Sequence, residues 1–215
     1  MSRAKITTTM GMIMPRPSER ALFLGMNGSG KTQAALALLR PLIGRIQIDI
    51  LDSKIEPAFL TLPGSQVVEH FDELPECVAP VRIYRPVAEE LADEHLLDDY
   101  LQWRYENAPN LLYIDEMNSL GAQTKPKPGL VNLTTRGRSR QAALWMSSQR
   151  PAWISRFAFS ETNRFYVFRL SDEDDRKRVV RFTTPQLKKV PARKYGFWYY
   201  HAGDENAYLF KPMKI

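Results

Sequence analysis

An eight-residue stretch near the N-terminus constrains the fold more than any other part of the chain. It follows the pattern G-x-x-x-x-G-K-[ST] and consists of Gly25, Met26, Asn27, Gly28, Ser29, Gly30, Lys31 and Thr32. The apolar run 21–24 before it predicts a buried strand, and residues 32–40 after it are strong helix formers stopped by Pro41. In that context the loop N–H groups and the helix N-terminus point at a phosphate. Lys31 then reaches the β- and γ-phosphates and the Thr32 hydroxyl can ligate Mg²⁺, so the sequence predicts a nucleotide site.

Length and composition favour one soluble domain. The 215 residues are enough for an α/β domain with a substantial core, and we expect an N-terminal arm over 1–19 and a single domain over 20–215. The one cysteine, Cys77, cannot form an intramolecular disulfide, and the three histidines show no ligand spacing. No apolar stretch approaches the length needed to cross a bilayer, and no signal-type apolar region follows the start. These features are typical of a protein from a reducing compartment.

The charge is distributed unevenly along the chain. Residues 122–194 hold 17 Lys and Arg against five Asp and Glu, whereas the stretch 89–99 is acidic. A basic half indicates a polyanionic partner, with nucleic acid as the first candidate. The alternative is a solvated surface combined with arginines of the nucleotide site.

A second motif lies downstream of the loop. The buried run 110–114 predicts a strand, and it ends at Asp115 and Glu116. In a nucleotide-binding sheet, Asp115 would hold Mg²⁺ through water, and Glu116 would orient and deprotonate the attacking water. The adjacent glutamate favours a hydrolytic motor over a relative that only switches.

The remaining pattern indicates a mixed, mostly parallel α/β sheet. Further strands are predicted at 45–52, 81–85, 142–148 and 163–170, helices at 91–105, 129–140 and 171–180, and a hairpin from 195–202 and 207–212. Residues 117–129 are loop-like. If the sheet is parallel, Asp52-Ser53-Lys54 at the end of the 45–52 strand faces the nucleotide.

Four segments together resemble the FtsK–HerA superfamily of DNA-pumping ATPases. They are 25–32, 52–54, 111–116, and 135–140 running into 147–151, and the resemblance covers roughly 20–182. The pairing of Arg138 with Gln149, about a dozen residues apart, is the specific part. The small size is most similar to the genome-packaging ATPases of tailless, internal-membrane double-stranded DNA viruses. The resemblance departs at the second strand, where the family has Asp-Pro-Lys.

The resemblance implies a RecA-like (ASCE) P-loop three-layer sandwich that binds ATP and Mg²⁺. It implies that Gln149 senses the γ-phosphate and positions water, and that Arg138 is the finger reaching a neighbouring subunit's nucleotide. Arg136, Arg140 and Arg164 are the alternative fingers. The implied assembly is a homo-oligomeric ring of five or six subunits. It would pump double-stranded DNA into a preformed capsid, with capsid, portal-vertex or viral membrane proteins as partners, in the host cytoplasm or at the packaging vertex.

The loop 121–129 is the candidate DNA contact, because it follows the Asp115-Glu116 strand directly. Lys125 and Lys127 each precede a proline that holds them extended, with no acidic neighbour in sequence. Two other functions stay open at this point. One is an export or conjugation motor of the same superfamily, which a membrane anchor would mark. The other is a non-motor P-loop enzyme such as a small-molecule kinase.

Overall fold

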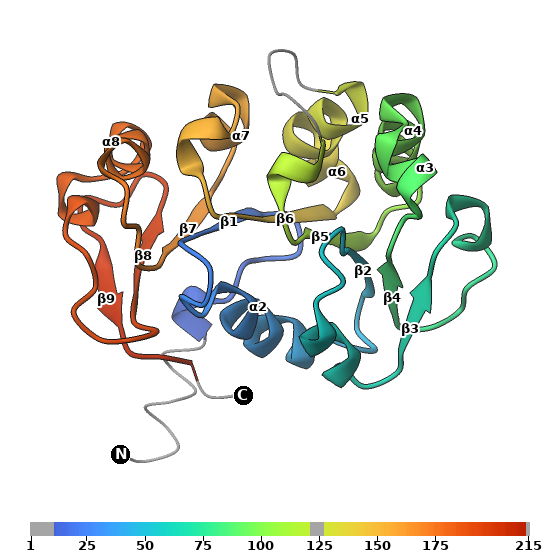
Figure 1. Cartoon of the computed structure of the whole chain (residues 1–215), viewed down its shortest axis with the longest axis horizontal. Coiled ribbons are helices and arrows are strands. Elements are labelled where there is room, and N and C mark those ends of the chain that lie inside the picture. Colours follow the sequence, from blue (N-terminus) through green and yellow to red (C-terminus); the bar gives the residue numbers. More distant parts are fainter. Residues whose placement is uncertain (1–10, 121–126, 214–215) are drawn as a thin grey trace.

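The protein has three layers, formed by a single sheet with helices on both of its faces. The computed structural model describes residues 11–120 and 127–213, and there the nine strands follow the order β3-β4-β2-β5-β6-β1-β7-β8-β9. Helices α3 to α8 cover one face of this sheet and α2 covers the other (Figure 1). The first seven strands pair in parallel, and the last two are antiparallel. The mostly parallel α/β fold with a C-terminal hairpin is therefore confirmed.

Most strand and helix bounds agree with the sequence pattern, but no helix was predicted at 156–160, and the helix predicted over 91–105 is preceded by a separate short helix at 88–92. The strands are β1 (Arg20–Leu24), β2 (Gln47–Leu51), β3 (Ser65–Val68), β4 (Val81–Tyr84), β5 (Asn110–Ile114), β6 (Ala142–Ser148), β7 (Arg164–Val167), β8 (Phe197–His201) and β9 (Tyr208–Phe210). The α-helices are α2 (Lys31–Leu39), α3 (Ala88–Ala92), α4 (Glu94–Glu106), α5 (Pro128–Val131), α6 (Gly137–Arg140), α7 (Arg156–Ser160) and α8 (Glu173–Phe182). The helix predicted over 129–140 is α5 and α6 joined by the π-helical turn η5 (Asn132–Arg136).

Strand β3 was not predicted. Its four residues Ser-Gln-Val-Val form the edge of the sheet, and only Val68 is buried. So short and exposed a strand carries too little periodicity to be recognised in a sequence.

The central strands read as continuous apolar runs because both faces of the sheet are covered. In β1, Leu22 and Leu24 enter the core beneath α4, α5 and α7, while Ala21 and Phe23 enter the core against α2. This alternation follows the two-residue period of a strand. The Phe23 ring stacks on that of Tyr166 from β7, with centroids 4.5 Å apart. Both faces of β1 are therefore fixed, which holds the loop that follows it.

Residues 11–19, which the sequence analysis assigns to an N-terminal arm, lie against the domain. Ile13 is buried in the α2-side core, and the Tyr166 hydroxyl donates a hydrogen bond to its carbonyl oxygen. Glu19 forms an ion pair with Arg164. An apolar side chain and an ion pair therefore hold this segment against the domain.

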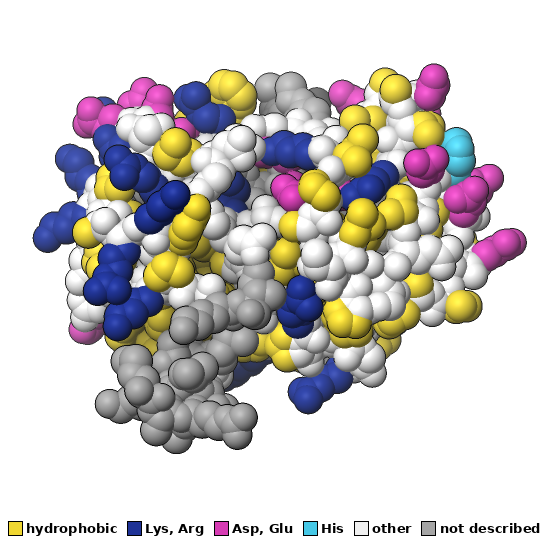
Figure 2. Space-filling view, turned by 60° about the horizontal axis from the view of Figure 1, so that its bottom comes forward, with side chains coloured by type: hydrophobic (Ala, Val, Ile, Leu, Met, Phe, Trp, Pro, Cys, Tyr) yellow, Lys and Arg dark blue, Asp and Glu magenta, His cyan; other side chains and the backbone are white. Residues whose placement is uncertain are grey.

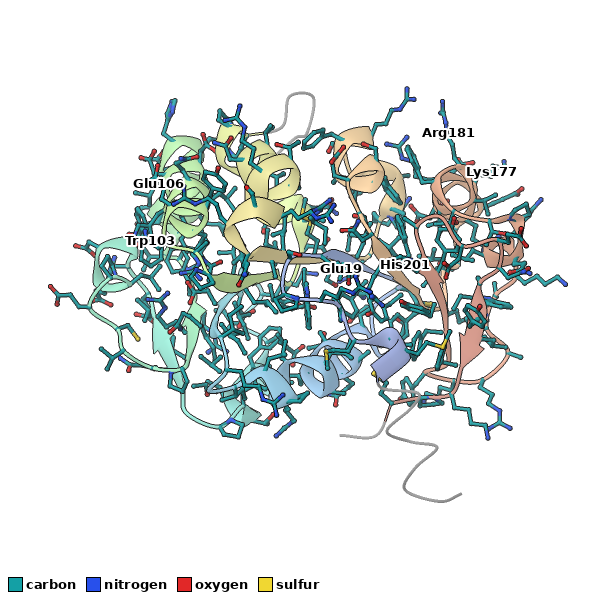
Figure 3. The ribbon with its side chains drawn as sticks, turned by 180° about the vertical axis from the view of Figure 1, so that it is seen from behind. Glu19, Trp103, Glu106, Lys177, Arg181 and His201 are labelled. Atoms are coloured by element: carbon teal, nitrogen blue, oxygen red, sulfur yellow. The ribbon has the colours of Figure 1, made fainter. Side chains whose placement is uncertain are left out.

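A buried ion cluster ties α4 to the sheet. Asp49 of β2 accepts from Arg82 of β4 at 2.7 Å and from Arg104 of α4 at 2.8 Å. The Trp103 ring, labelled in Figure 3, lies 5.1 Å from each guanidinium. Removing one partner of such a cluster leaves an uncompensated buried charge, so the cluster fixes where α4 sits.

Candidate nucleotide-binding and catalytic site

The carboxyl ends of four adjacent parallel strands meet at one edge of the sheet. Gly25, after β1, donates its N–H to Ser148 of β6, and Asp115, after β5, donates its N–H to Leu51 of β2. The sheet order β2-β5-β6-β1 therefore brings four predicted segments together. A cavity of about 540 Å³ opens at this edge. The residues that line it from these segments include Gly28, Lys31, Thr32, Lys54, Asp115 and Gln149.

The loop before α2 has the geometry of an anion cradle. Gly30 has φ 102°, in the left-handed region that glycine adopts without strain, and no side chain caps the helix that starts at Lys31. A Cβ on Gly25 would lie 2.7 Å from both Phe168 Cβ and Ser29 Oγ, so only glycine fits there. The first N–H groups of α2 are thus left for a ligand at the helix N-terminus.

Lys31 is buried in the floor of the cavity. Its Nζ donates to the carbonyl oxygens of Gly25 at 2.7 Å and Met26 at 3.1 Å. Burial lowers the pKa of Lys31 to about 8, and the nearby carboxylates of Glu116 and Asp115 act in the opposite direction. A buried ammonium held only by two carbonyl oxygens is well placed to exchange them for phosphate oxygens.

The two carboxylates after β5 have different environments. Burial and the neighbouring Asp52 raise the pKa of Asp115 to about 6, against the effect of Lys54 and Lys31. Glu116 is paired instead: its Oε2 lies 2.6 Å from Lys54 Nζ, while its buried Oε1 has no hydrogen-bond partner in the described part of the chain. One oxygen of Glu116 is therefore fixed and the other is free to accept a proton or a hydrogen bond.

Within the Asp52-Ser53-Lys54 segment, the aspartate has a structural role and the lysine belongs to the site. Asp52 is fully buried, and it accepts from the Glu56 N–H at 3.0 Å and from Arg85 at 2.9 Å. It anchors the turn after β2, whereas Lys54 reaches the cavity. The sequence indicated that the segment faces the nucleotide side but not that Lys54 pairs with Glu116, which lies 62 residues away.

One wall of the cavity is apolar and was not predicted. It is lined by Phe168, Tyr195, Pro212 and Met213, which lie around the C-terminal hairpin. These residues come from segments that the sequence marks only as strand ends and turns, so no motif identified them.

The candidate arginine fingers lie at the other end of the sheet. Arg138 is on α6, immediately before β6, while Gln149 follows β6; a seven-residue strand separates them by roughly 20 Å. The Arg138 side chain is exposed and forms no hydrogen bond or ion pair to the described residues. Arg136 contacts Asn132 at 3.4 Å, and Arg140 donates to the Glu106 carbonyl at 3.0 Å. Arg138 is therefore too far to reach the nucleotide of its own subunit.

Arg164 is occupied within its own subunit. It is 7% exposed, pairs with Glu19 and donates hydrogen bonds to the Met12 carbonyl and the Tyr199 hydroxyl. The Glu19 contact raises the pKa of Arg164 against the effect of burial. Figure 3 shows Glu19 beside His201 of β8, consistent with their 3.6 Å separation.

Of the two candidate DNA-binding lysines, Lys125 lies outside the described residues. Lys127 is at the start of α5, where its Nζ donates to the Glu94 carbonyl at 3.0 Å and lies 3.7 Å from the Glu94 carboxylate. Its side chain is only 10% exposed. The lysine thus has an acidic partner that lies 33 residues away in sequence.

The comparisons with known proteins agree with this geometry. No protein-family model matches the chain. The DNA packaging ATPase P9 of Enterobacteria phage PRD1 is 30% identical over 215 residues, which span 95% of this chain and 91% of P9. The chain belongs to the P9 family. Within the part that the structure describes, no helix is long and apolar enough to span a membrane.

Solved structures share the fold with this P9 family member at lower identity. The genome packaging NTPase B204 of Sulfolobus turreted icosahedral virus 2, in complex with sulfate, superimposes with a TM-score of 0.77 at 14% identity, covering 93% of this chain and 98% of B204. B204 has also been solved with AMPPCP and with ATP-gammaS. The pCW3 conjugation coupling protein TcpA matches with a TM-score of 0.60 at 18% identity, covering 90% of this chain and 59% of TcpA.

Proposed function

We propose that this protein is an ATP-hydrolysing motor that pumps double-stranded DNA into a preformed viral capsid. The observation that carries the proposal is the convergence of the phosphate loop, Asp115 and Gln149 on one cavity, with Glu116 paired to the cavity residue Lys54, in a member of the P9 family. An enzyme that only transferred a phosphate to a small molecule would not need a carboxylate and an amide beside the terminal phosphate to handle water.

The phosphate chain of ATP would lie along the loop, with its oxygens at the N–H groups of residues 28–32 and at the Lys31 ammonium. Thr32 and Asp115 would hold Mg²⁺, and they fit it because hydroxyl and carboxylate oxygens are the donors it prefers. When bound, Mg²⁺ would neutralise charge on the phosphate oxygens.

Glu116 would act as the general base. Its unpartnered Oε1 is the acceptor for a proton of the attacking water, and Gln149 would orient that water against the terminal phosphate. Lys54 would be a positioning residue, because its ammonium holds the other oxygen of the same carboxylate.

Lys54→Met should therefore cost turnover rather than affinity. The substitution keeps the length of the side chain but removes the cation, so the Glu116 carboxylate loses its anchor. We expect hydrolysis to slow by roughly ten- to a hundredfold, because small misplacements of a catalytic group have effects of this size. The Kd for ADP, which offers no terminal phosphate, should stay near wild type. Lys54→Arg keeps the charge and should retain most activity; unchanged turnover in Lys54→Met would remove Lys54 from the mechanism.

Arg138 would complete the site of a neighbouring subunit. Phosphoryl transfer develops negative charge that a fixed guanidinium stabilises. Arg138 is exposed at the opposite end of the sheet from its own loop, so it would act across an interface between subunits, which a homo-oligomeric ring of five or six subunits would supply. The ring would dock on capsid, portal-vertex or viral membrane proteins.

The DNA path is better supported on a different surface from Lys127. The run 176–194 holds eight Lys and Arg and no Asp or Glu. Figure 2 shows Lys and Arg side chains gathered on the flank of the molecule over β8 and β9 (at left). Four exposed side chains of this run form no ion pair to any described residue: Arg181, Lys188, Lys189 and Arg193.

The geometry of α8 supports the same surface. Figure 3 shows Lys177 and Arg181 extending outward from this helix. Lys177 is paired with Glu173 and Asp174, both at 3.4 Å. Arg178 has no such partner among the described residues: burial lowers its pKa most, and the nearby charge of Arg181 lowers that pKa further. Uncompensated like charges in proximity favour a polyanion such as the DNA backbone.

Lys188→Ala/Lys189→Ala should weaken DNA binding in a salt-dependent and sequence-independent way. Each lost phosphate contact lowers the dependence of log K on log salt by about one unit, so the slope should fall by up to about two. Basal ATPase should stay near wild type. Arg45→Ala, which removes an exposed arginine beside β2, is the matched control and should change neither quantity. An unaltered slope in the double variant would exclude these two lysines from the DNA contact.

The proposed function is tested by ATP turnover measured with linear double-stranded DNA, with single-stranded DNA and without DNA. Double-stranded DNA should stimulate the rate several-fold, and single-stranded DNA of equal length should stimulate it less. Turnover that is indifferent to DNA would favour a non-motor enzyme on the same fold.

A further inference from the structure

Only part of the lining of the nucleotide cavity is polar. The loop, Lys54, Asp115 and Gln149 supply its polar lining, and the apolar wall described above supplies the rest. A phosphate chain uses only the polar lining, because its oxygens need the N–H groups and cations that are found there. The apolar lining is therefore suited to the part of a ligand that is flat and uncharged.

Tyr195 is the most unusual residue of that wall. Its backbone has φ 62°, a left-handed conformation that bulky residues rarely adopt. The turn is closed by a hydrogen bond of 3.0 Å from the Gly196 N–H to the Arg193 carbonyl, and a Cβ on Gly196 would lie 3.2 Å from the carbonyl oxygens of Arg193 and Phe210. The hairpin thus holds Tyr195 in a strained backbone conformation, and such conformations are frequent at ligand sites.

In this conformation the aromatic ring of Tyr195 lies beside the phosphate loop. A Cβ on Gly30 would lie 3.4 Å from Tyr195 Cβ and Cδ1 and 3.7 Å from a ring carbon of Phe168. Phe168 is buried and stacks on Phe197, whose centroid is 5.1 Å away, so this part of the wall is rigid. Tyr195 itself is 45% exposed. An exposed aromatic face on a rigid support is poised for stacking.

A neighbouring lysine and the course of the C-terminal segment also favour a ligand beside Tyr195. Lys194 Nζ lies over the Tyr195 ring, 5.0 Å from its centroid, which places a positive charge beside that ring. The segment after β9 leaves the edge of the sheet and runs back toward α2, so Pro212 and Met213 reach the cavity (Figure 1). An aromatic ring, a proline and a thioether that line one cavity suit the chemistry of a planar heterocycle.

We propose that Tyr195 stacks on the nucleobase of the bound nucleotide, and that Pro212 and Met213 pack against the same base. The proposal rests on the proposed ATPase function, because it assigns the base subsite of that nucleotide. The hairpin therefore contributes to nucleotide recognition as well as to the edge of the sheet.

The experiment compares ligands that share the phosphate chain but differ in the base. Dissociation constants are measured for ADP, for AMPPCP and for inorganic tripolyphosphate, which has no base. Tyr195→Asn removes the ring but keeps a residue that tolerates positive φ, so the turn is preserved. Because stacking of a base on an aromatic ring is worth roughly 1–3 kcal/mol, the Kd of ADP and AMPPCP should rise about five- to a hundredfold. The Kd of tripolyphosphate should not change.

Tyr195→Phe is the matched control and should bind all three ligands like wild type, because the phenyl ring stacks as the phenol does. Unchanged ADP affinity in Tyr195→Asn would overturn the proposal. An equal loss of ADP and tripolyphosphate would also overturn it, since Tyr195 would then act only by shaping the loop. If the wild-type protein bound tripolyphosphate but not ADP, the base subsite would be wrong; if it bound neither, the proposed ATPase function would fail as well.

Discussion

Replacing Glu116 with glutamine is expected to slow ATP hydrolysis by roughly 10²- to 10⁴-fold while nucleotide binding persists. The amide has the same shape as the carboxylate but cannot accept the proton of the attacking water. Lys31 and the loop, which are expected to bind the phosphates, are untouched. Phosphate release under single-turnover conditions, together with the Kd of AMPPCP, separates the chemical step from binding.

Glu56→Gln is the matched control for this variant, because Glu56 lines the same cavity but its carboxylate caps η2 (Pro57–Thr61). Its turnover should stay near wild type. Normal turnover in Glu116→Gln would show that the two carboxylates after β5 are only strand-end residues. Loss of AMPPCP binding would instead mean that Glu116 shapes the site rather than reacting in it.

Mixing two inactive proteins should restore activity if Arg138 acts across a subunit interface. Lys31→Ala removes the loop cation and Arg138→Ala removes the finger, and each protein alone should be nearly inactive. In mixed rings some interfaces pair an intact loop with an intact finger. An arginine finger is worth roughly 10³–10⁵ in rate, so even a minority of such interfaces should be measurable by steady-state turnover.

Two controls make the mixing experiment decisive. Arg136→Ala mixed with Lys31→Ala tests the nearest alternative, since Arg136 lies on the turn before α6. Differently tagged subunits, co-purified after mixing, establish that mixed rings form. If they form and Arg138→Ala recovers nothing, then Arg138 is structural, and Arg140 becomes the next candidate.

The chemical segments of the site could be predicted because each is local in sequence. The phosphate loop, the Asp115-Glu116 pair and Gln149 all directly follow apolar strands, and parallel pairing brings such ends to one edge. Strand β6 between β1 and β5 then sets Gln149 between loop and carboxylates. The local pattern and the pairing direction were sufficient for this part.

The contacts that tune the site could not be predicted, because they join residues far apart in sequence. Lys54 meets Glu116 across 62 positions, Lys127 meets Glu94 across 33, and Arg164 meets Glu19 across 145. A basic residue has many possible partners in a folded chain, and its sequence neighbours do not identify the one it meets. For the same reason Lys127 and Arg164 looked free in the sequence, and Tyr195 looked like an ordinary strand start.

The most direct test of the central claim, ATP-driven movement along double-stranded DNA, is displacement of a triplex-forming strand. A third strand bound at the end of a linear duplex is released when a motor travels through it. Wild-type protein should release it only with hydrolysable ATP, and more slowly as the distance to the triplex grows. Glu116→Gln should release none. Release that occurs equally with AMPPCP, or no release while ATP is being hydrolysed on the same DNA, would contradict translocation.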